Sequence, residues 1–123
     1  MTSVKNVALS PTSVRQECCD YLGVCECAVF DNIRIWADER GLYDNGDPKT
    51  QALKLVEEVG ETCRAILKED HDEVVDGIGD CVVVLTNLAE LIGTPIEECI
   101  EQAYFEISKR KGKMINGTFV KDE

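Results

Sequence analysis

Acidic side chains are concentrated in one stretch of the sequence, residues 56 to 80. It holds only two cations, Arg64 and Lys68, against nine carboxylates: Glu57, Glu58, Glu61, Glu69, Asp70, Asp72, Glu73, Asp76 and Asp80. Like charges this dense repel one another, so a folded protein that keeps them together needs something to compensate them. Carboxylate oxygens are the ligands that Mg²⁺ and Mn²⁺ prefer. The stretch therefore predicts a divalent-metal site.

The spacing of these residues predicts two acidic patches on consecutive helices. Residues three or four apart share a helix face, and a helix turns by about 100° per residue. The first patch would hold Glu57, Glu58 and Glu61, and the second Glu73, Asp76 and Asp80, with Asn87 on the same line. A short connection would let the two helices run side by side with their patches facing each other.

The alternative is that both patches are solvated helix faces, which are common on amphipathic helices. Two features favour a site instead. The nearby cations are few, with only Lys54 and Arg64 close by, and the segment "CVVVLTNLAELI" is apolar nearly all round. Because such a helix must be covered on more than one side, we expect the acidic patch to open into a covered cleft that a partner subunit could close.

Helix signals dominate the rest of the chain. Apolar spacing predicts a helix over about 25–40 that ends at Gly41, followed by the turn "LYDNGDPK". Asp47 can cap the next helix, with Pro48 at its first position, and that helix should run to about residue 68. After the break "EDHD", a further helix should span about 72–92 and end at Gly93.

Thr94 to Glu97 read as a capping box for a last helix over about 95–111, with "KRKGK" at its negative end. "MINGTFV" predicts a β-hairpin that turns at Asn116-Gly117. Residues 1–12 look like a loose arm, with a short helix near 13–22. The expected fold is a single all-α domain over 1–123, an antiparallel bundle of four to five helices with a short C-terminal β-hairpin.

Composition narrows the class of function. The formal net charge of −11 argues against nucleic-acid polymers and anionic membrane surfaces as partners. No apolar run reaches the roughly 18 residues of a membrane span, and no signal peptide is visible, so we expect a cytoplasmic protein. The seven cysteines do not suggest a disulfide framework, and the group Cys18, Cys19, Cys25 and Cys27 lacks a standard zinc spacing.

The motifs "EEVGE" and "DGIGD" resemble the signature of the all-α nucleoside triphosphate pyrophosphohydrolases, the MazG-like group, which is related to dimeric dUTPases and phosphoribosyl-ATP pyrophosphohydrolase. That signature is E-E-x-x-E followed by E-x-x-D on the next helix. Flanking segments such as "IWADERGL", "QALKLVEEVGE" and "AYFEISKRKGKMINGTFVK" also look similar, so the resemblance covers roughly residues 29 to 121.

The resemblance implies roles for individual residues. Glu58 and Glu61 match the first metal-binding pair, and Asp80 matches the aspartate of the second motif. Gly77 stands where the family has a glutamate, so Asp76 or Glu73 on the same arc would supply the missing carboxylate. The expected metal ligands are Glu58, Glu61, Asp76 and Asp80, while a spare carboxylate, Glu57 or Glu73, would orient the attacking water.

Six further residues could either bind the substrate or have a structural role. The candidates are Lys54, Trp36, Asn87, Tyr104, Lys109 and Arg110. Trp36 and Tyr104 could stack on a base or pack in the core. Lys109 and Arg110 could bind phosphates or could only interact favourably with the negative end of a helix dipole. Lys54 could bind a phosphate or pair with Glu58. In "AYFEI", Phe105 stands where the family often has a nucleotide-binding asparagine.

The function that the resemblance implies is Mg²⁺-dependent, or Mn²⁺-dependent, hydrolysis of a nucleoside triphosphate to the monophosphate and pyrophosphate. The partners would be the small nucleotide and further copies of the chain, as a homodimer or homotetramer. One alternative is a non-catalytic acidic helical interaction module, and another is a dUTP or phosphoribosyl-ATP specialist with the same chemistry. The sequence contains no P-loop.

Overall fold

The computed structural model describes residues 28–123. The predicted N-terminal arm, the helix near 13–22 and the cysteine group at 18–27 lie outside this part. Its elements in chain order are α2 (Val29–Glu39), α3 (Leu42–Asn45), α4 (Pro48–Leu67), α5 (His71–Ile92), α6 (Ile96–Ile107), β1 (Gly112–Ile115) and β2 (Thr118–Lys121). The predicted all-α class with a C-terminal hairpin is confirmed.

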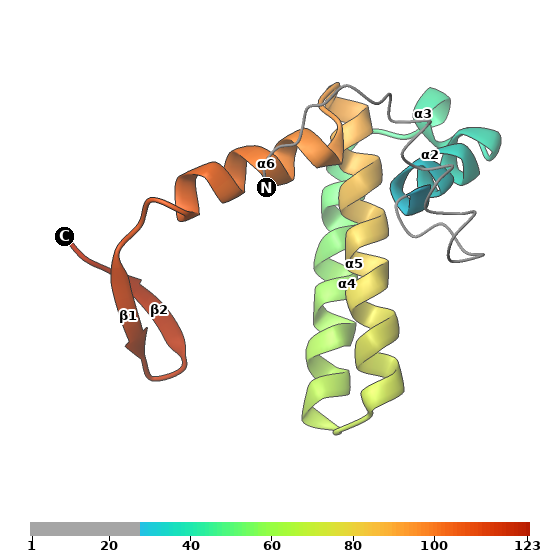
Figure 1. The fold of residues 1–123 in the computed structure, drawn as a ribbon. Coiled ribbons are helices and arrows are strands. Elements are labelled where there is room, and N and C mark those ends of the chain that lie inside the picture. Colours follow the sequence, from blue (N-terminus) through green and yellow to red (C-terminus); the bar gives the residue numbers. More distant parts are fainter. Residues whose placement is uncertain (1–27) are drawn as a thin grey trace, which may run out of the picture.

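The centre of the structure is an antiparallel pair of long helices, α4 and α5 (Figure 1). Helix α4 starts as predicted, with Pro48 at its first position and the Asp47 carboxylate accepting a hydrogen bond from the Thr50 amide at 3.0 Å. The Asp70 carboxylate caps α5 in the same way, at the Glu73 amide. Gly93, with φ of 86°, ends α5.

The two long helices approach each other closely at Gly77. A Cβ added there would overlap the hydroxyl of Thr62 and lie 3.1 Å from its Cβ and 3.3 Å from its Cα. The Thr62 hydroxyl donates a hydrogen bond to the Glu58 carbonyl at 2.8 Å, which fixes its direction. A residue with a side chain at 77 would therefore push α4 and α5 apart.

The short helices α2 and α3 pack on the C-terminal half of α5 (Figure 1). The Tyr43 hydroxyl donates a 2.6 Å hydrogen bond to the side-chain carbonyl of Asn87, which is only 2% exposed. Arg34 joins three elements. Its guanidinium binds Asp31 on its own helix and Glu97 on α6, both at 2.7 Å, and it lies 3.9 Å from Glu90 on α5. These contacts hold α2 and the start of α6 against α5.

Three local predictions need correction. The turn "LYDNGDPK" contains a single helical turn, α3. The capping box does not form, because Pro95 is the cap residue of α6 and no side chain caps that end. Instead, the Thr94 amide bonds to the Ala89 carbonyl and completes the end of α5 at Gly93. Helix α6 ends at Ile107 rather than near 111, so the basic residues follow the helix and its last turn contains none.

The C-terminal arm, defined as α6 and the hairpin (residues 96–121), projects away from the α4–α5 pair (Figure 1). Strands β1 and β2 pair antiparallel around Asn116-Gly117, both with positive φ, as the sequence predicts. Every residue from Ile100 to Glu123 is exposed. None of the helices within residues 28–123 has the length and apolar character needed to cross a bilayer.

Candidate functional site

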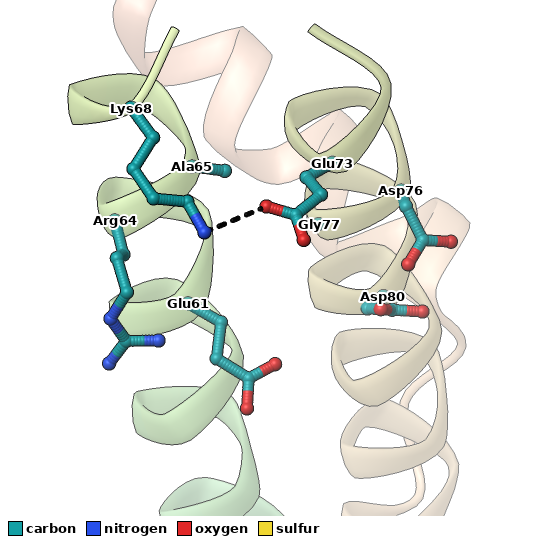
Figure 2. A pocket seen from close by; sticks show the side chains of 8 residues that line it. All are labelled: Glu61, Arg64, Ala65, Lys68, Glu73, Asp76, Gly77 and Asp80. Carbon is teal, nitrogen blue, oxygen red and sulfur yellow. Dashed lines mark ion pairs between the residues drawn. The ribbon is translucent and has the colours of Figure 1, made fainter. Parts of the chain in front are cut away.

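A polar pocket of about 180 Å³ lies between α4 and α5 (Figure 2). Both predicted acidic patches contribute to it. The lining residues are Glu61, Arg64, Ala65 and Lys68 from α4, and Glu73, Asp76, Gly77 and Asp80 from α5. The expectation that two consecutive helices bring their carboxylates to a shared space is therefore met. The pocket is open rather than covered, since Glu61, Glu73 and Asp76 are exposed within the single chain.

Asp80 is the residue on which the negative charges converge. Burial raises the pKa of its carboxyl group, and the nearby carboxylates of Asp76 and Glu58 raise it further, while Lys54 acts in the opposite direction. Negative charge at Asp80 is therefore under-compensated by the protein itself. A bound cation at this position would relieve the repulsion.

Glu58 is the one buried carboxylate of α4, with 8% exposure. Its partner is Lys54, whose ammonium group lies 3.1 Å from both Glu58 and Glu57. Hydrogen bonds to Glu57 and then to Glu58 raise the pKa of Lys54. Lys54 thus holds the carboxylates of Glu57 and Glu58 in place, about one helical turn before Glu61.

A second ion pair spans the two helices at the far end of the pocket. Lys68 of α4 lies 3.4 Å from Glu73 of α5 (Figure 2). Glu61 extends from α4 toward α5, whereas Asp76 and Asp80 occupy successive turns of α5 (Figure 2). The pocket therefore has carboxylates near Asp80 and a cation-lined end near Lys68.

The side chains suit a hard divalent cation in chemical type, because all the anionic donors are carboxylate oxygens. Within residues 28–123, no three acidic, cysteine or histidine side chains lie close enough together to hold a metal ion by themselves. Magnesium is commonly held by one or two carboxylates together with substrate phosphates, so it does not need a preformed cage. The arrangement around Asp80 fits that mode of binding.

Asp80 also lines a second, more apolar pocket of about 390 Å³. Its other lining residues are Val29, Asn32, Ile33, Trp36 and Val83. Trp36 is 47% exposed, and the guanidinium of Arg40 lies 4.6 Å from its ring centre. The sequence pointed to Trp36 but missed Asn32, although Asn32 precedes Trp36 by one helical turn and so shares its face.

Comparison with protein families identifies the domain that holds the two acidic patches. The sequence profile of the MazG nucleotide pyrophosphohydrolase domain matches residues 47–115, which include α4, α5, α6 and the first hairpin strand. The chain belongs to this family. The MazG match covers both acidic patches and the polar pocket between them.

A curated relative of the MazG chain comes from the Haemophilus phage HP1 (strain HP1c1), where it is described as an uncharacterized 18.2 kDa protein in the rep-hol intergenic region. The two are 44% identical over 62 residues, which is 50% of this chain and 38% of the phage protein. The chain therefore matches well under half of the phage protein's length. No solved structure matches the chain.

The MazG signature residues are only partly brought together. Asp76, Asp80 and Glu61 line one pocket, and Glu58 acts on Asp80 electrostatically. Glu57 lies outside that lining, paired with Lys54. Gly77, where the resemblance leads us to expect a glutamate, lies in the lining at a point where the helices leave no space for a side chain.

The remaining predicted substrate contacts lie elsewhere. Asn87 is buried and bonded to Tyr43, so its amide is part of the packing between α3 and α5. Tyr104, Lys109 and Arg110 are exposed on the C-terminal arm and line neither of the two pockets described above. The ammonium of Lys109 lies 3.8 Å from the ring centre of Phe105. Within one chain, these arm residues are not at the site.

Proposed function

We propose that the protein is a metal-dependent nucleoside triphosphate pyrophosphohydrolase that converts an NTP or dNTP to the monophosphate and pyrophosphate. The observation that carries the proposal is Asp80, which lies within the MazG match and is shared by a carboxylate-lined pocket and an aromatic pocket. Phosphates and base of one nucleotide would then occupy adjacent pockets. The metal would be Mg²⁺, with Mn²⁺ as a substitute.

The residues that would hold the metal are Glu58, Glu61, Asp76 and Asp80. When bound, the ion would offset phosphate charge and lower the pKa of an attacking water. Asp76 would take the place of the glutamate that the family carries at position 77, because Gly77 has no room for it. Repulsion among Asp76, Asp80 and Glu58 favours a cation there and would be relieved on loading.

In the hydrolysis, a water oxygen would bond to the α-phosphorus, and the bond from that phosphorus to the α–β bridging oxygen would break. Glu73 is the better placed of the two spare carboxylates to orient this water, since it lines the pocket whereas Glu57 does not. Lys68, 3.4 Å from Glu73, would hold that carboxylate in place at the end of the pocket. Lys54 would act by holding Glu57 and Glu58 in place.

The apolar pocket would receive the base. Trp36 presents an exposed aromatic surface for stacking, and Val29, Ile33 and Val83 provide apolar walls. Among the lining residues, Asn32 is the uncharged polar side chain, able both to donate and to accept a hydrogen bond. Trp36 and Asn32 would thus affect the KM for nucleotides more than the rate of the chemical step.

A substrate panel tests this function. The purified chain is incubated with each of the common NTPs and dNTPs and with phosphoribosyl-ATP in Mg²⁺, and the products are separated by anion exchange. We expect a monophosphate and pyrophosphate in equal amounts, and no reaction in excess EDTA. Preference for dUTP or phosphoribosyl-ATP alone would identify the specialist. No turnover of any nucleotide with Mg²⁺ or Mn²⁺ would refute the proposal and favour a non-catalytic acidic module.

A further inference from the structure

The polar pocket has two chemically different ends. Seven residues separate Glu61 from Lys68 on α4, and seven separate Asp80 from Glu73 on α5. Seven residues correspond to about 10 Å along a helix axis. Because the two helices are antiparallel, Glu61 lies at the Asp80 end of the pocket (Figure 2). Lys68 lies at the other end, 3.4 Å from Glu73. A ligand longer than one phosphate could therefore reach from the carboxylates to the cationic end.

Arg64 lines this pocket without a protein partner for its charge. It belongs to α4, one turn before Lys68. Within residues 28–123, its guanidinium makes no ion pair or side-chain hydrogen bond, although Glu61 lies three residues earlier on the same helix. A guanidinium group has five N–H donors in a planar fork that matches the oxygens of a phosphate. In the described part of the chain, these donors are therefore available to a ligand.

The two lysines near the site differ in how firmly they are engaged. Lys54 lies 3.1 Å from both Glu57 and Glu58, and it lines neither of the two pockets described above. Lys68 and Glu73 are both 57% exposed, and exposed ion pairs contribute little to stability. An ammonium group has three donors, so Lys68 can contact a phosphate and keep Glu73. Of the two lysines, Lys68 is therefore the one placed to receive an anion inside the pocket.

The two pockets determine the direction in which a nucleotide would lie. Asp80 is shared by both, with Trp36 on the apolar side and Lys68 at the far end of the polar side. A base beside Trp36 and an α-phosphate at a metal near Asp80 leave the rest of the polar pocket for the two outer phosphates. These phosphates would extend away from the apolar pocket, toward Arg64 and Lys68.

We propose that Arg64 and Lys68 form the subsite for the two outer phosphates of the substrate, which leave together as pyrophosphate. The inference rests on the proposed function, since it assigns the place of that reaction's leaving group. When the bond from the α-phosphorus to the bridging oxygen breaks, its electron pair stays on the pyrophosphate. Two cations at this end stabilise the added negative charge. Both also lie at the C-terminal end of α4, where cations interact favourably with the helix dipole, so a test has to separate binding from helix stability.

Isothermal titration of the full chain with pyrophosphate in excess Mg²⁺ tests the subsite without needing turnover. Arg64→Gln should raise the pyrophosphate dissociation constant at least about tenfold. Lys68→Gln should raise it less, because Lys68 is shared with Glu73. Arg64→Lys keeps the charge but loses the fork, and its constant should lie between those of wild type and Arg64→Gln. Lys49→Gln removes an exposed cation of α4 that lines neither of the two pockets, and it should leave the constant unchanged.

Kinetics separates a contact with the outer phosphates from a general loss of the site. For a triphosphate that the chain hydrolyses, Arg64→Gln should raise the KM about tenfold. The inhibition constant of the corresponding monophosphate, which lacks the outer phosphates, should stay within about twofold of the wild-type value. A dipole contribution to α4 would instead lower the melting temperature and leave both constants unchanged. If circular dichroism shows that Arg64→Gln has lost helix, Arg64→Lys and Lys68→Gln decide.

The outcomes separate this subsite from the catalytic proposal. Pyrophosphate binding that depends on Arg64, in a chain without turnover, would refute the catalytic proposal and leave the subsite standing. The subsite would be overturned by a wild type that does not bind pyrophosphate in Mg²⁺, or by Arg64→Gln binding it as tightly as Lys49→Gln does. An equal loss of monophosphate and pyrophosphate binding in Arg64→Gln would also overturn it, because the residue would then act on the whole site.

Discussion

Substituting Gly77 by alanine tests whether the close approach of α4 and α5 excludes a side chain at this position. A methyl group at 77 would overlap the Thr62 hydroxyl and approach the Thr62 Cα to 3.3 Å, so α4 and α5 would have to move apart. Overpacking of this kind costs about 1–3 kcal/mol, whereas replacing a helical glycine by alanine gains up to about 1 kcal/mol. We therefore expect Gly77→Ala to lower the free energy of unfolding by up to about 2 kcal/mol.

Urea unfolding followed by circular dichroism measures the effect, and two other glycines provide matched controls. Gly60 on α4 and Gly79 on α5 have no atom within 4 Å of an added Cβ, so Gly60→Ala and Gly79→Ala should be neutral or stabilising. Thr62→Ala removes the hydroxyl that blocks position 77, and in a double variant it should recover part of the loss. If Gly77→Ala is as stable as Gly79→Ala, the close approach of the helices is not what excludes a side chain at 77.

Three other perturbations have expected outcomes. Asp80→Asn should raise the metal-free melting temperature at pH 7, because the folded state raises the pKa of Asp80 and so disfavours its charged form. The gain should vanish at acidic pH, where Asp80 is protonated. A lower melting temperature in EDTA would contradict this prediction. Glu97→Gln should lower the free energy of unfolding by less than about 1 kcal/mol at pH 7, because Arg34 lowers the pKa of Glu97. The stabilisation by this ion pair is lost as the pH falls below 4.5, the ordinary pKa of a glutamate. A stability difference between wild type and Glu97→Gln that persists in acid would argue against the ion pair. Tyr43→Phe should lower the free energy of unfolding in urea by about 1–3 kcal/mol, because the buried Asn87 side-chain carbonyl loses its hydrogen-bond donor. An unchanged urea midpoint would show that a water molecule replaces the tyrosine hydroxyl.

Much of the fold could be predicted because the signals are local. Asp47 and Pro48 define the start of α4 through a cap and a fixed φ, and Gly93 ends α5 in a left-handed conformation. Asn116 and Gly117 likewise determine the hairpin turn. Each of these features depends on residues within one or two turns of one another, so local sequence patterns predict them.

The features that the sequence did not predict depend on distant contacts. Thr94 matches a cap pattern, but its amide is used by α5, so only the packed end of that helix decides its role. Asn87 follows the acidic line along α5, yet it is bonded to Tyr43, 44 residues away. The Arg34–Glu97 ion pair, which links α2 to the start of α6, likewise joins residues 63 apart in the sequence.

The site shows the same division. Helical spacing predicted that Glu61, Asp76 and Asp80 would meet, because periodicity alone places them on facing sides of adjacent helices. The pocket formed by Trp36, Asn32 and Val83 combines α2 with α5, and no local pattern links those elements. The absence of space at Gly77 could be found only once the distance to Thr62 was known.

The most direct test of the central claim compares pyrophosphate release by wild type, Asp80→Asn and Glu61→Gln, with Mg²⁺ and with excess EDTA. We expect Mg²⁺-dependent turnover in wild type and a loss of at least roughly a hundredfold in each variant, equivalent to about 2.7 kcal/mol of transition-state stabilisation. Asp76→Asn should behave like Asp80→Asn, whereas Glu73→Gln should be milder. Near-normal, Mg²⁺-dependent turnover in both Asp80→Asn and Glu61→Gln would show that the chemistry does not take place in the pocket between α4 and α5.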